Sequence, residues 1–338
     1  MRLSSLGDVL LTTPLIRILS KTYPNAKIDY IVAEPYSEIL TNNPYISNLL
    51  IYDKSKSIFK PLKNPELLCN DYDILIDLQK NIRTKFISLN RAKIKTKYSK
   101  QRFHKLSLVY RKNPLVENFS VPLNYIKSIG LNELEDDALG LEFWLKKDRQ
   151  ANDYLPFSKK YTKESNPLIT IAPGARHNTK RWTDQGFIEL IKILKKKYDC
   201  EINLVGSKSE IEVCSFIQSQ IDFTLNDYCG KLSIEESAEL IDTSDLVISN
   251  DSGIMHIAAA RKVPVVVIYG STVPEFGFLP FRTHYEIVQK DLSCRPCTHI
   301  GRESCPKKHF DCMNLITPND VLNKIDELFK RISKNQLL

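Results

Sequence analysis

The chain alternates short apolar segments with helical or turn-rich ones, and this alternation occurs twice. In the N-terminal half the apolar segments are residues 27–32, 48–52 and 73–78, and in the C-terminal half they are residues 168–172, 201–205, 246–249 and 263–269. Strands that alternate with helices are typical of βαβ units, in which the strands are parallel and buried on both faces. The sequence therefore predicts an α/β protein with two parallel sheets.

A polar segment with two prolines separates the two alternating regions. A chain of 338 residues is long enough for two domains. We expect an N-terminal Rossmann-like domain over residues 1–153, a linker over residues 154–167, and a second Rossmann-like domain over residues 168–338 that ends in a helix. Ligands of such domains bind at the carboxyl ends of the strands, so the predicted ligand cleft lies between the two domains.

No apolar segment approaches the ~18 residues that a membrane-spanning helix needs. Residues 6–19 are largely apolar but contain Asp8 and Arg17, which predicts an amphipathic helix rather than a signal peptide. We therefore expect a cytoplasmic protein, in which the eight cysteines stay reduced.

Positive charge is concentrated in one part of the chain. Residues 83–112 contain eleven Lys and Arg and no Asp or Glu, whereas the whole chain has a net charge of +8. Such a segment binds nucleic acid, an anionic membrane surface or an acidic substrate, or it is simply a solvated helical face. Nucleic acid is the least favoured partner, because the sequence contains no recognisable nucleic-acid-binding module.

Two common nucleotide-binding motifs are missing from the sequence. No two glycines have the spacing of the Gly-x-Gly-x-x-Gly dinucleotide motif, and none have the spacing of a Walker A loop. Their absence argues against an oxidoreductase or an NTPase. Asp71-Tyr72-Asp73 has the form of a metal-binding Asp-x-Asp, but acidic residues directly before a strand more often mark a turn.

Three segments have the residues needed to hold an anion or to move a proton. In residues 2–14 a turn of small residues leads into a helix, and Asp8 lies in its first turn, as a cap or as a functional carboxylate. In residues 172–182, Gly174 and three cations follow a strand, which suits a diphosphate but also describes an ordinary basic loop. In residues 249–260 small polar residues open a helix, and His256 lies one turn into it, in a structural or a binding role.

These segments, with residues 264–275, resemble the glycosyltransferases of family 9, the ADP-heptose:lipopolysaccharide heptosyltransferases. Cys294-Arg295-Pro296-Cys297, followed by Cys305-Pro306 and Asp311-Cys312-Met313, resembles the C-terminal region of that family. The resemblance extends over roughly residues 2–321 and is weakest over residues 80–161. It implies the GT-B fold, in which two Rossmann-like domains face a central cleft.

The resemblance also implies an activity and a set of site residues. The reaction would be an inverting transfer of heptose from ADP-heptose to the anionic inner core of lipopolysaccharide, without a metal or another cofactor. Asp8 would be the general base, with Ser4, Ser5 and Gly7 near the acceptor. The donor residues implied in this way are Lys180 and Arg176 for the phosphates, Glu210 for the ribose, Lys231 near the base, and Asp251, Ser252, Gly253 and His256 along the diphosphate and sugar.

A core acceptor lies at the inner face of the inner membrane, so we expect peripheral contact with that membrane, which the basic residues 83–112 would favour. Two alternatives stay open: the same fold with another sugar or acceptor, and a non-catalytic nucleotide-sugar-binding protein. Relatives have a full strand before residues 2–5, so here the first strand is very short or the true start lies upstream. The spacing Cys294-x₂-Cys297-x₇-Cys305-x₆-Cys312 allows a zinc site, although packed reduced cysteines are the favoured interpretation.

Overall fold

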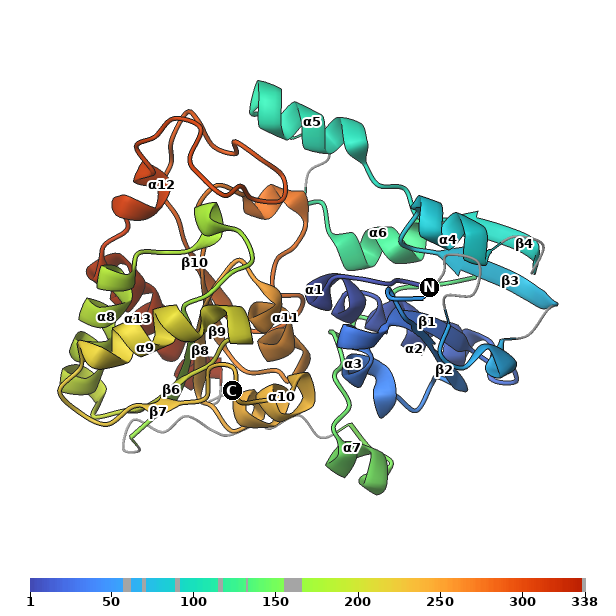
Figure 1. The fold of residues 1–338 in the computed structure, drawn as a ribbon, viewed down its shortest axis with the longest axis horizontal. Coiled ribbons are helices and arrows are strands. Elements are labelled where there is room, and N and C mark those ends of the chain that lie inside the picture. The colour runs from blue at the N-terminus through green and yellow to red at the C-terminus, as the bar shows by residue number, and fades with distance from the viewer. Residues whose placement is uncertain are drawn as a thin grey trace. The chain divides into compact units, whose positions relative to one another are not determined.

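The computed structural model describes residues 1–56, 62–68, 71–88, 92–114, 118–131, 133–154 and 166–335. The chain divides into two compact units (Figure 1). The first contains Met1–Gln101 and Ser120–Leu155, and the second contains Arg102–Phe119 and Pro156–Leu338. Among the described residues no helix combines the length and the apolar character needed to cross a bilayer.

The second unit is built on a six-stranded sheet with the order β10-β9-β8-β5-β6-β7, in which every neighbouring pair is parallel. Its strands are β5 (Leu168–Ala172), β6 (Glu201–Leu204), β7 (Asn226–Asp227), β8 (Leu246–Asn250), β9 (Val265–Ile268) and β10 (Tyr285–Val288). All residues of β8 and β9 are buried, because helices cover both faces of the sheet. The predicted strands of this half are confirmed to within two residues at each end.

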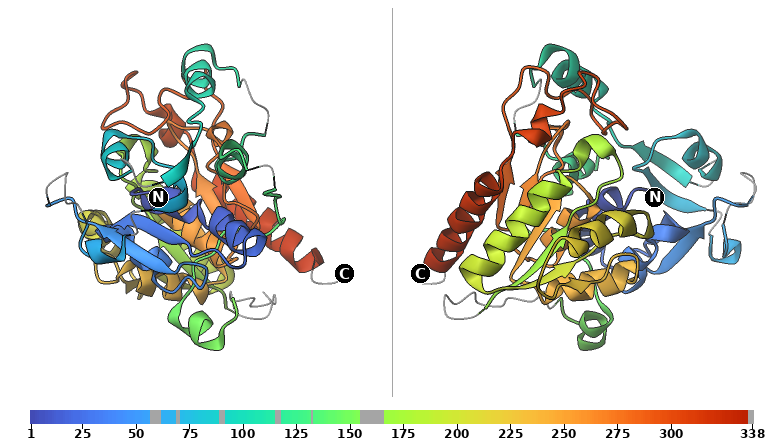
Figure 2. Two further views of the ribbon diagram at one scale, coloured as in Figure 1. Left: turned by 90° about the vertical axis from the view of Figure 1, so that its right-hand side faces the viewer. Right: turned by 60° about the vertical axis from the view of Figure 1, so that its left-hand side comes forward.

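Helices pack on both faces of this sheet. They are α8 (Asp184–Tyr198), α9 (Ile211–Ser219), α10 (Ile234–Asp242), α11 (Gly253–Ala260), α12 (Asp311–Asn314) and α13 (Pro318–Asn335). Figure 1 shows the strands between one group, α8, α9 and α13, and a second group, α10 and α11. Helix α8 begins after Thr183, because the Thr183 hydroxyl accepts a hydrogen bond from the Gly186 N–H at 3.1 Å. Figure 2 turns the same ribbon to show α8 and α13 in front of the sheet.

The first unit contains two pairs of parallel strands, β1 (Asp29–Ala33) with β2 (Asn48–Tyr52) and β3 (Tyr72–Asp77) with β4 (Ala92–Lys97). Residues 1–3 lie between the two pairs. Arg2 N–H donates to Ile31 O at 3.2 Å, and Leu78 N–H donates to Met1 O at 3.1 Å. Residues 1–3 are thus hydrogen-bonded through their backbone to both pairs, although they do not form a regular strand.

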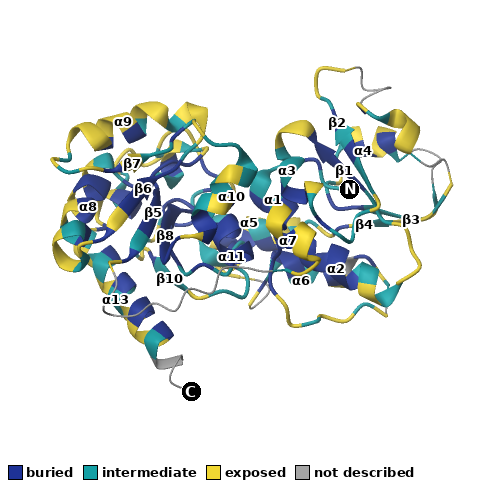
Figure 3. Cartoon of the chain, turned by 90° about the horizontal axis from the view of Figure 1, so that it is seen from below, coloured by how far each residue is buried: buried dark blue, intermediate teal, exposed yellow. Residues whose placement is uncertain are grey.

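The predicted helix over residues 6–19 is wrong in one respect, because it is two helices, α1 (Leu6–Leu10) and α2 (Thr13–Thr22). Pro14 has no N–H to donate to the carbonyl of Leu10, and the hydroxyl of Thr13 donates to that carbonyl instead, at 2.8 Å. The remaining short helices of this unit are α3 (Glu38–Thr41), α4 (Ile82–Ile87), α6 (Val121–Ser128) and α7 (Lys146–Ala151). Figure 3 shows that β1 is largely buried, and the burial of the residues in β4 is intermediate or low.

Helix α5 (Arg102–Arg111) belongs to the second unit, although it lies within the N-terminal half of the sequence. A ring nitrogen of His104 lies 3.0 Å from Glu275 O, and the Lys112 ammonium donates to Pro296 O at 2.6 Å. The basic residues 83–112 are thus divided between the units, which the sequence pattern did not predict.

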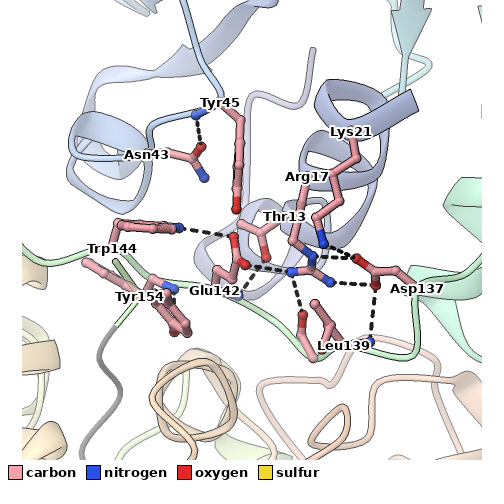
Figure 4. Close-up of polar contacts among 12 residues, drawn as sticks. Thr13, Arg17, Lys21, Asn43, Tyr45, Asp137, Leu139, Glu142, Trp144 and Tyr154 are labelled. Carbon is pink, nitrogen blue, oxygen red and sulfur yellow. Dashed lines mark hydrogen bonds and ion pairs between the residues drawn. The ribbon is translucent and has the colours of Figure 1, made fainter. Parts of the chain in front are cut away.

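A buried arginine joins α2 to residues 137–144 of the first unit (Figure 4). The Arg17 guanidinium donates to both oxygens of Asp137, at 2.7 and 2.9 Å, and lies 2.9 Å from Glu142 Oε1. Glu142 Oε2 accepts from the indole N–H of Trp144 at 3.0 Å. Burial raises the pKa of Asp137, but the hydrogen bonds and charge of Arg17 outweigh it and lower the pKa to about 2. This stabilisation is present above the ordinary value of 3.8 and is lost as the pH falls through about 2.

We predict that Arg17→Ala lowers the free energy of unfolding by about 3–5 kcal/mol, because it leaves the buried carboxylate of Glu142 and the partly buried one of Asp137 without the cation that they share. Lys21→Ala is the matched control: Lys21 lies 3.4 Å from the same Asp137 but is 52% exposed, so its loss should cost less than ~1 kcal/mol. Urea unfolding at pH 7 measures both. Equal effects of the two substitutions would contradict the role given to Arg17.

Candidate functional site

The order of strands in the six-stranded sheet creates a site at the carboxyl ends of β5 and β8. From β5 the chain goes first to β6 on one side and later to β8 on the other, so the loops after β5 and β8 diverge at this point. Such a reversal leaves a crevice at the carboxyl edge of an open α/β sheet, and ligands bind there. The loop after β5 contains Lys180, and β8 runs directly into Asp251.

Lys180 and Asp251 meet at this edge. The Lys180 ammonium lies 2.6 Å from Asp251 Oδ2, and their side chains are 16% and 10% exposed. The same carboxylate oxygen accepts a hydrogen bond from the Thr272 hydroxyl at 2.6 Å, and Thr272 lies in the loop after β9. Three loops of the sheet thus place one cation and one carboxylate together at this edge. A small part of each side chain is exposed, so the ammonium is accessible to an anion.

Asn250, the last residue of β8, fixes the loop that contains Lys180. Its amide donates to Pro173 O at 2.7 Å, and its Oδ1 accepts from the Trp182 N–H at 3.0 Å. One buried amide therefore holds both ends of the loop after β5. Neither Asn250 nor Thr272 was identified from the sequence, because a polar residue at a strand end has no periodic signal.

Helix α11 starts at the same edge, and its first two residues are partly exposed. Ser252 is the residue before the helix, but its side chain makes no capping bond, and its hydroxyl lies 3.1 Å from that of Ser249 instead. The first N–H groups of α11, beginning with Gly253, therefore stay available for an anion. His256 is buried one turn further along. A buried ion pair between Arg261 and Asp242, 2.7 Å long, fastens α11 to α10.

Glu210 lies beside the loop after β5. Its Oε2 accepts from the Ser207 N–H at 2.6 Å and from the Ser207 hydroxyl at 2.9 Å, which leaves Oε1 for another donor. A Cβ atom on Gly174 would lie only 1.9 Å from Oε1, so a larger residue at position 174 would displace the carboxylate. The structure thus brings Glu210 next to the segment that contains Lys180.

The backbone next to Lys231 is hydrogen-bonded to the loop that leads to Glu210. The Gly230 N–H donates to Gly206 O at 2.9 Å, and Gly230 has a φ of +71°, which suits glycine. The Lys231 ammonium itself donates to Asp227 O at 2.5 Å and is 61% exposed. Arg176 is exposed, so its assignment has the least structural support.

A disulfide between Cys214 and Cys229 joins α9 to the residue before Gly230. The expectation that all eight cysteines stay reduced is therefore wrong for this pair. The two cysteines are 15 positions apart, and both lie between Glu210 and Lys231 in the sequence. Their bond therefore closes a loop within the segment that joins these two residues. Their sulfur atoms and Asp227 form a group of potential metal ligands within 4.8 Å, but sulfurs bonded to each other are not thiolates.

The four C-terminal cysteines are free thiols. Burial raises the pKa of Cys312 to about 12 and also raises the pKa of Cys297, so both thiols favour the protonated form. Cys294 Sγ lies 4.0 Å from His309 Nε2. In the part of the chain that the structure describes, no three of these cysteines have their sulfur atoms within 4.8 Å of one another.

The first unit presents Asp8 as a firmly anchored carboxylate. Its Oδ1 lies 2.7 Å from the Arg2 guanidinium, and its Oδ2 accepts from the N–H and the hydroxyl of Ser5, at 3.1 and 2.9 Å. Arg2 is held in turn by Leu78 O at 2.7 Å. Arg2 was not identified from the sequence.

The electrostatic surroundings keep Asp8 ionised. Burial by itself raises the pKa of Asp8, but the charge of Arg2 and the hydrogen bonds from Ser5 outweigh burial, so the pKa is lower than usual. The Asp8 side chain is 20% exposed. Ser4, Ser5 and Gly7 surround it, and Ser5 together with Asp8 forms a capping box for α1. The carboxylate thus caps a helix and remains partly accessible.

The chain is similar to known proteins over most of its length. Residues 64–308 match the model of glycosyltransferase family 9 (heptosyltransferase). The chain is 26% identical to the lipopolysaccharide core heptosyltransferase OpsX of Haemophilus influenzae, with 80% of this chain and 77% of that protein covered. It is 29% identical to lipopolysaccharide heptosyltransferase 3 of Escherichia coli, with 79% and 80% covered.

A solved structure, that of the Escherichia coli ADP-heptose LPS heptosyltransferase II, matches with a TM-score of 0.71 at 20% identity and covers 98% of this chain and 99% of that one. The predicted fold class, GT-B with Rossmann-like α/β units, is thereby confirmed. Because the family model covers more than half of the chain, this protein belongs to glycosyltransferase family 9, the heptosyltransferases.

Proposed function

We propose that this glycosyltransferase transfers heptose from ADP-heptose to the inner core of lipopolysaccharide, with inversion and without a metal ion. The proposal rests on one observation at the carboxyl edge of the sheet. The Lys180 ammonium lies beside Asp251, directly before the uncapped start of α11. A cation and a helix N-terminus together stabilise the negative charge that develops on a departing diphosphate. The relatives named above are heptosyltransferases of lipopolysaccharide, which supports this choice of donor and acceptor.

The proposed donor site lies in the C-terminal Rossmann-like domain, residues 168–338, and the proposed acceptor site in the N-terminal one, residues 1–153. Asp251 positions the Lys180 ammonium, while Ser252, Gly253 and His256 line the diphosphate and the sugar. Glu210 has one carboxylate oxygen available for the ribose hydroxyls. The backbone at Lys231 lies near the base, and Arg176 assists at the phosphates.

Asp8 is the proposed general base, with Ser4, Ser5 and Gly7 near the acceptor. Its carboxylate is ionised at neutral pH, which is the form that accepts a proton. A low pKa makes it a weak base, so proton transfer becomes favourable only late, when bond formation to the anomeric carbon has made the attacking hydroxyl acidic. Arg2 and Ser5 hold the carboxylate in place until then.

The lysines of β4 support an anionic acceptor and a location beside the inner membrane. Lys93, Lys95 and Lys97 alternate along the strand, which puts them on one face, and all three are exposed. Lysines on an edge strand also prevent pairing with other chains, which is their simplest structural role. We propose that they attract the carboxylates and phosphates of the core acceptor at the cytoplasmic side of the membrane.

A second candidate is a nucleotide-sugar-binding protein without transferase activity. The observation that favours it is the capping box, because both oxygens of Asp8 already have partners within the chain. Release of ADP from ADP-heptose only in the presence of a core acceptor distinguishes the transferase from the binding protein.

For Asp8→Asn we predict a kcat lower by about 10²–10⁴-fold and a nearly unchanged affinity for ADP, because a carboxamide cannot accept the proton. Asp73→Asn removes a carboxylate that is 88% exposed in the same unit, and it should change neither quantity. Steady-state kinetics and thermal unfolding measure the effects. A lower melting temperature with an unchanged kcat would assign Asp8 to helix capping alone.

The pH dependence of kcat should contain no base titrating between pH 5 and 8, because the pKa of Asp8 is below its usual value and its active, ionised form persists throughout that range. The rate of the wild-type enzyme over that range checks this. A basic group with an apparent pKa near 7, still present in Asp8→Asn, would identify a different base.

Lys180→Ala should raise the Kd for ADP by about 10- to 150-fold, equivalent to the about 1.5–3 kcal/mol of one charged hydrogen bond. Lys192→Ala is the control, since Lys192 is an exposed lysine on α8. Calorimetric titration of both variants of the full chain measures the Kd. An unchanged Kd in Lys180→Ala would place the diphosphate elsewhere.

The double substitution Lys95→Gln and Lys97→Gln should raise the KM for a core acceptor and leave the affinity for ADP unchanged, because it removes cations only from the first unit. Added salt should reproduce the effect in the wild type, since exposed charges are screened beyond roughly 8–10 Å. A KM insensitive to both changes would leave β4 with its role in edge protection.

A further inference from the structure

Helix α5 has one buried face and one exposed apolar face. His104, Ser107 and Leu108 are buried. Phe103, Leu106 and Tyr110 recur at the spacing of one helical face, and they are 83%, 51% and 78% exposed. Monomeric proteins seldom expose large apolar side chains in such a group, and where they do the group usually marks an interaction site.

The buried face fixes α5 to the second unit, so the apolar face has a defined direction within that unit. His104 contacts Glu275 O, and the Lys105 ammonium lies 5.5 Å from the centre of the Phe278 ring. Just beyond the helix, Lys112 donates to Pro296 O. Figure 1 shows α5 beside the loops that precede α12. The exposed residues thus belong to an anchored helix and not to a frayed segment.

Positive charge surrounds the apolar face. Arg102 and Arg111 lie at the two ends of α5 and are exposed, and in the described part of the chain neither has an ion-pair partner. Helix α5 contains no Asp or Glu. A helix with exposed aromatic and aliphatic side chains on one side and only cations among its charges is typical of elements that lie in the headgroup region of a bilayer.

We propose that the face of α5 formed by Phe103, Leu106 and Tyr110, with Arg102 and Arg111, docks on the surface of an anionic lipid bilayer. The charge complementarity decides between partners: anionic headgroups pair with the arginines while the three apolar side chains enter the boundary with the acyl chains. The surface lies on the unit proposed to bind the donor, so membrane contact is not confined to the unit proposed to bind the acceptor. The inference adds a membrane-binding surface to the proposed function. It rests on that function only for the identity of the membrane.

The test is partition of the full chain onto vesicles. Wild-type protein should sediment with vesicles that contain phosphatidylglycerol and much less with neutral phosphatidylcholine vesicles. The double substitution Phe103→Ser and Tyr110→Ser, and separately Arg102→Gln with Arg111→Gln, should each lower the partition coefficient at least tenfold. Phe216→Ser is the matched control, because Phe216 is a 49% exposed aromatic residue on α9, outside the basic segment, and should leave partition unchanged.

Melting temperature and ADP affinity should be unchanged in the α5 variants, as should transfer to an acceptor freed of its acyl chains. Partition equal to the wild type in both α5 variants overturns the proposal. Loss of self-association in the variants, detected by sedimentation velocity, with unchanged vesicle binding also overturns it and identifies a protein interface. If the wild type partitions as expected but transfers no heptose, the proposed function fails while the docking surface remains.

Discussion

The parallel pairing of β5 with β8 is the constraint on which the proposed donor site depends. The pairing is fixed over four residues, from Ile169 opposite Leu246 to Ala172 opposite Ser249. Because the two strands end side by side and their loops then diverge, Lys180 and Asp251 meet although 71 positions separate them. The Asn250 amide fixes the loop after β5, because it bonds to the backbone at both ends of that loop. A slip of one residue between the strands would separate the cation from its carboxylate.

In the first unit, the carboxylate of Asp8 lies on a helix of only five residues. Such a helix has little stability of its own. Arg2 and Ser5 supply what the helix lacks, because they hold the Asp8 carboxylate from outside the helix and from its start. The same contacts that orient the group also lower its pKa. Orientation and basicity are therefore opposed in this site, and the geometry favours orientation.

The sequence predicted those parts of the fold that follow from local patterns. Asn48 and Leu168 begin strands where predicted, because apolar runs act over a few residues. The break at Pro14 had a local signal, but the apolar pattern on both sides concealed it. Contacts between distant residues had no such signal: the partners of Asp8 and Asp251 were found only in the structure, as were the buried Arg17 cluster and the disulfide.

The assignment of α5 to the second unit has a consequence for how the polypeptide is made. Residues 102–112 leave the ribosome long before the loop residues that they contact in the second unit, Glu275 and Pro296. Chains grow at about 5–20 residues per second, so an apolar and strongly basic helix waits for many seconds without its partner. Its sequence can stay unpacked during that interval because cations repel one another and keep it hydrated. The charge that suits α5 to a membrane surface thus also protects the nascent chain from premature collapse.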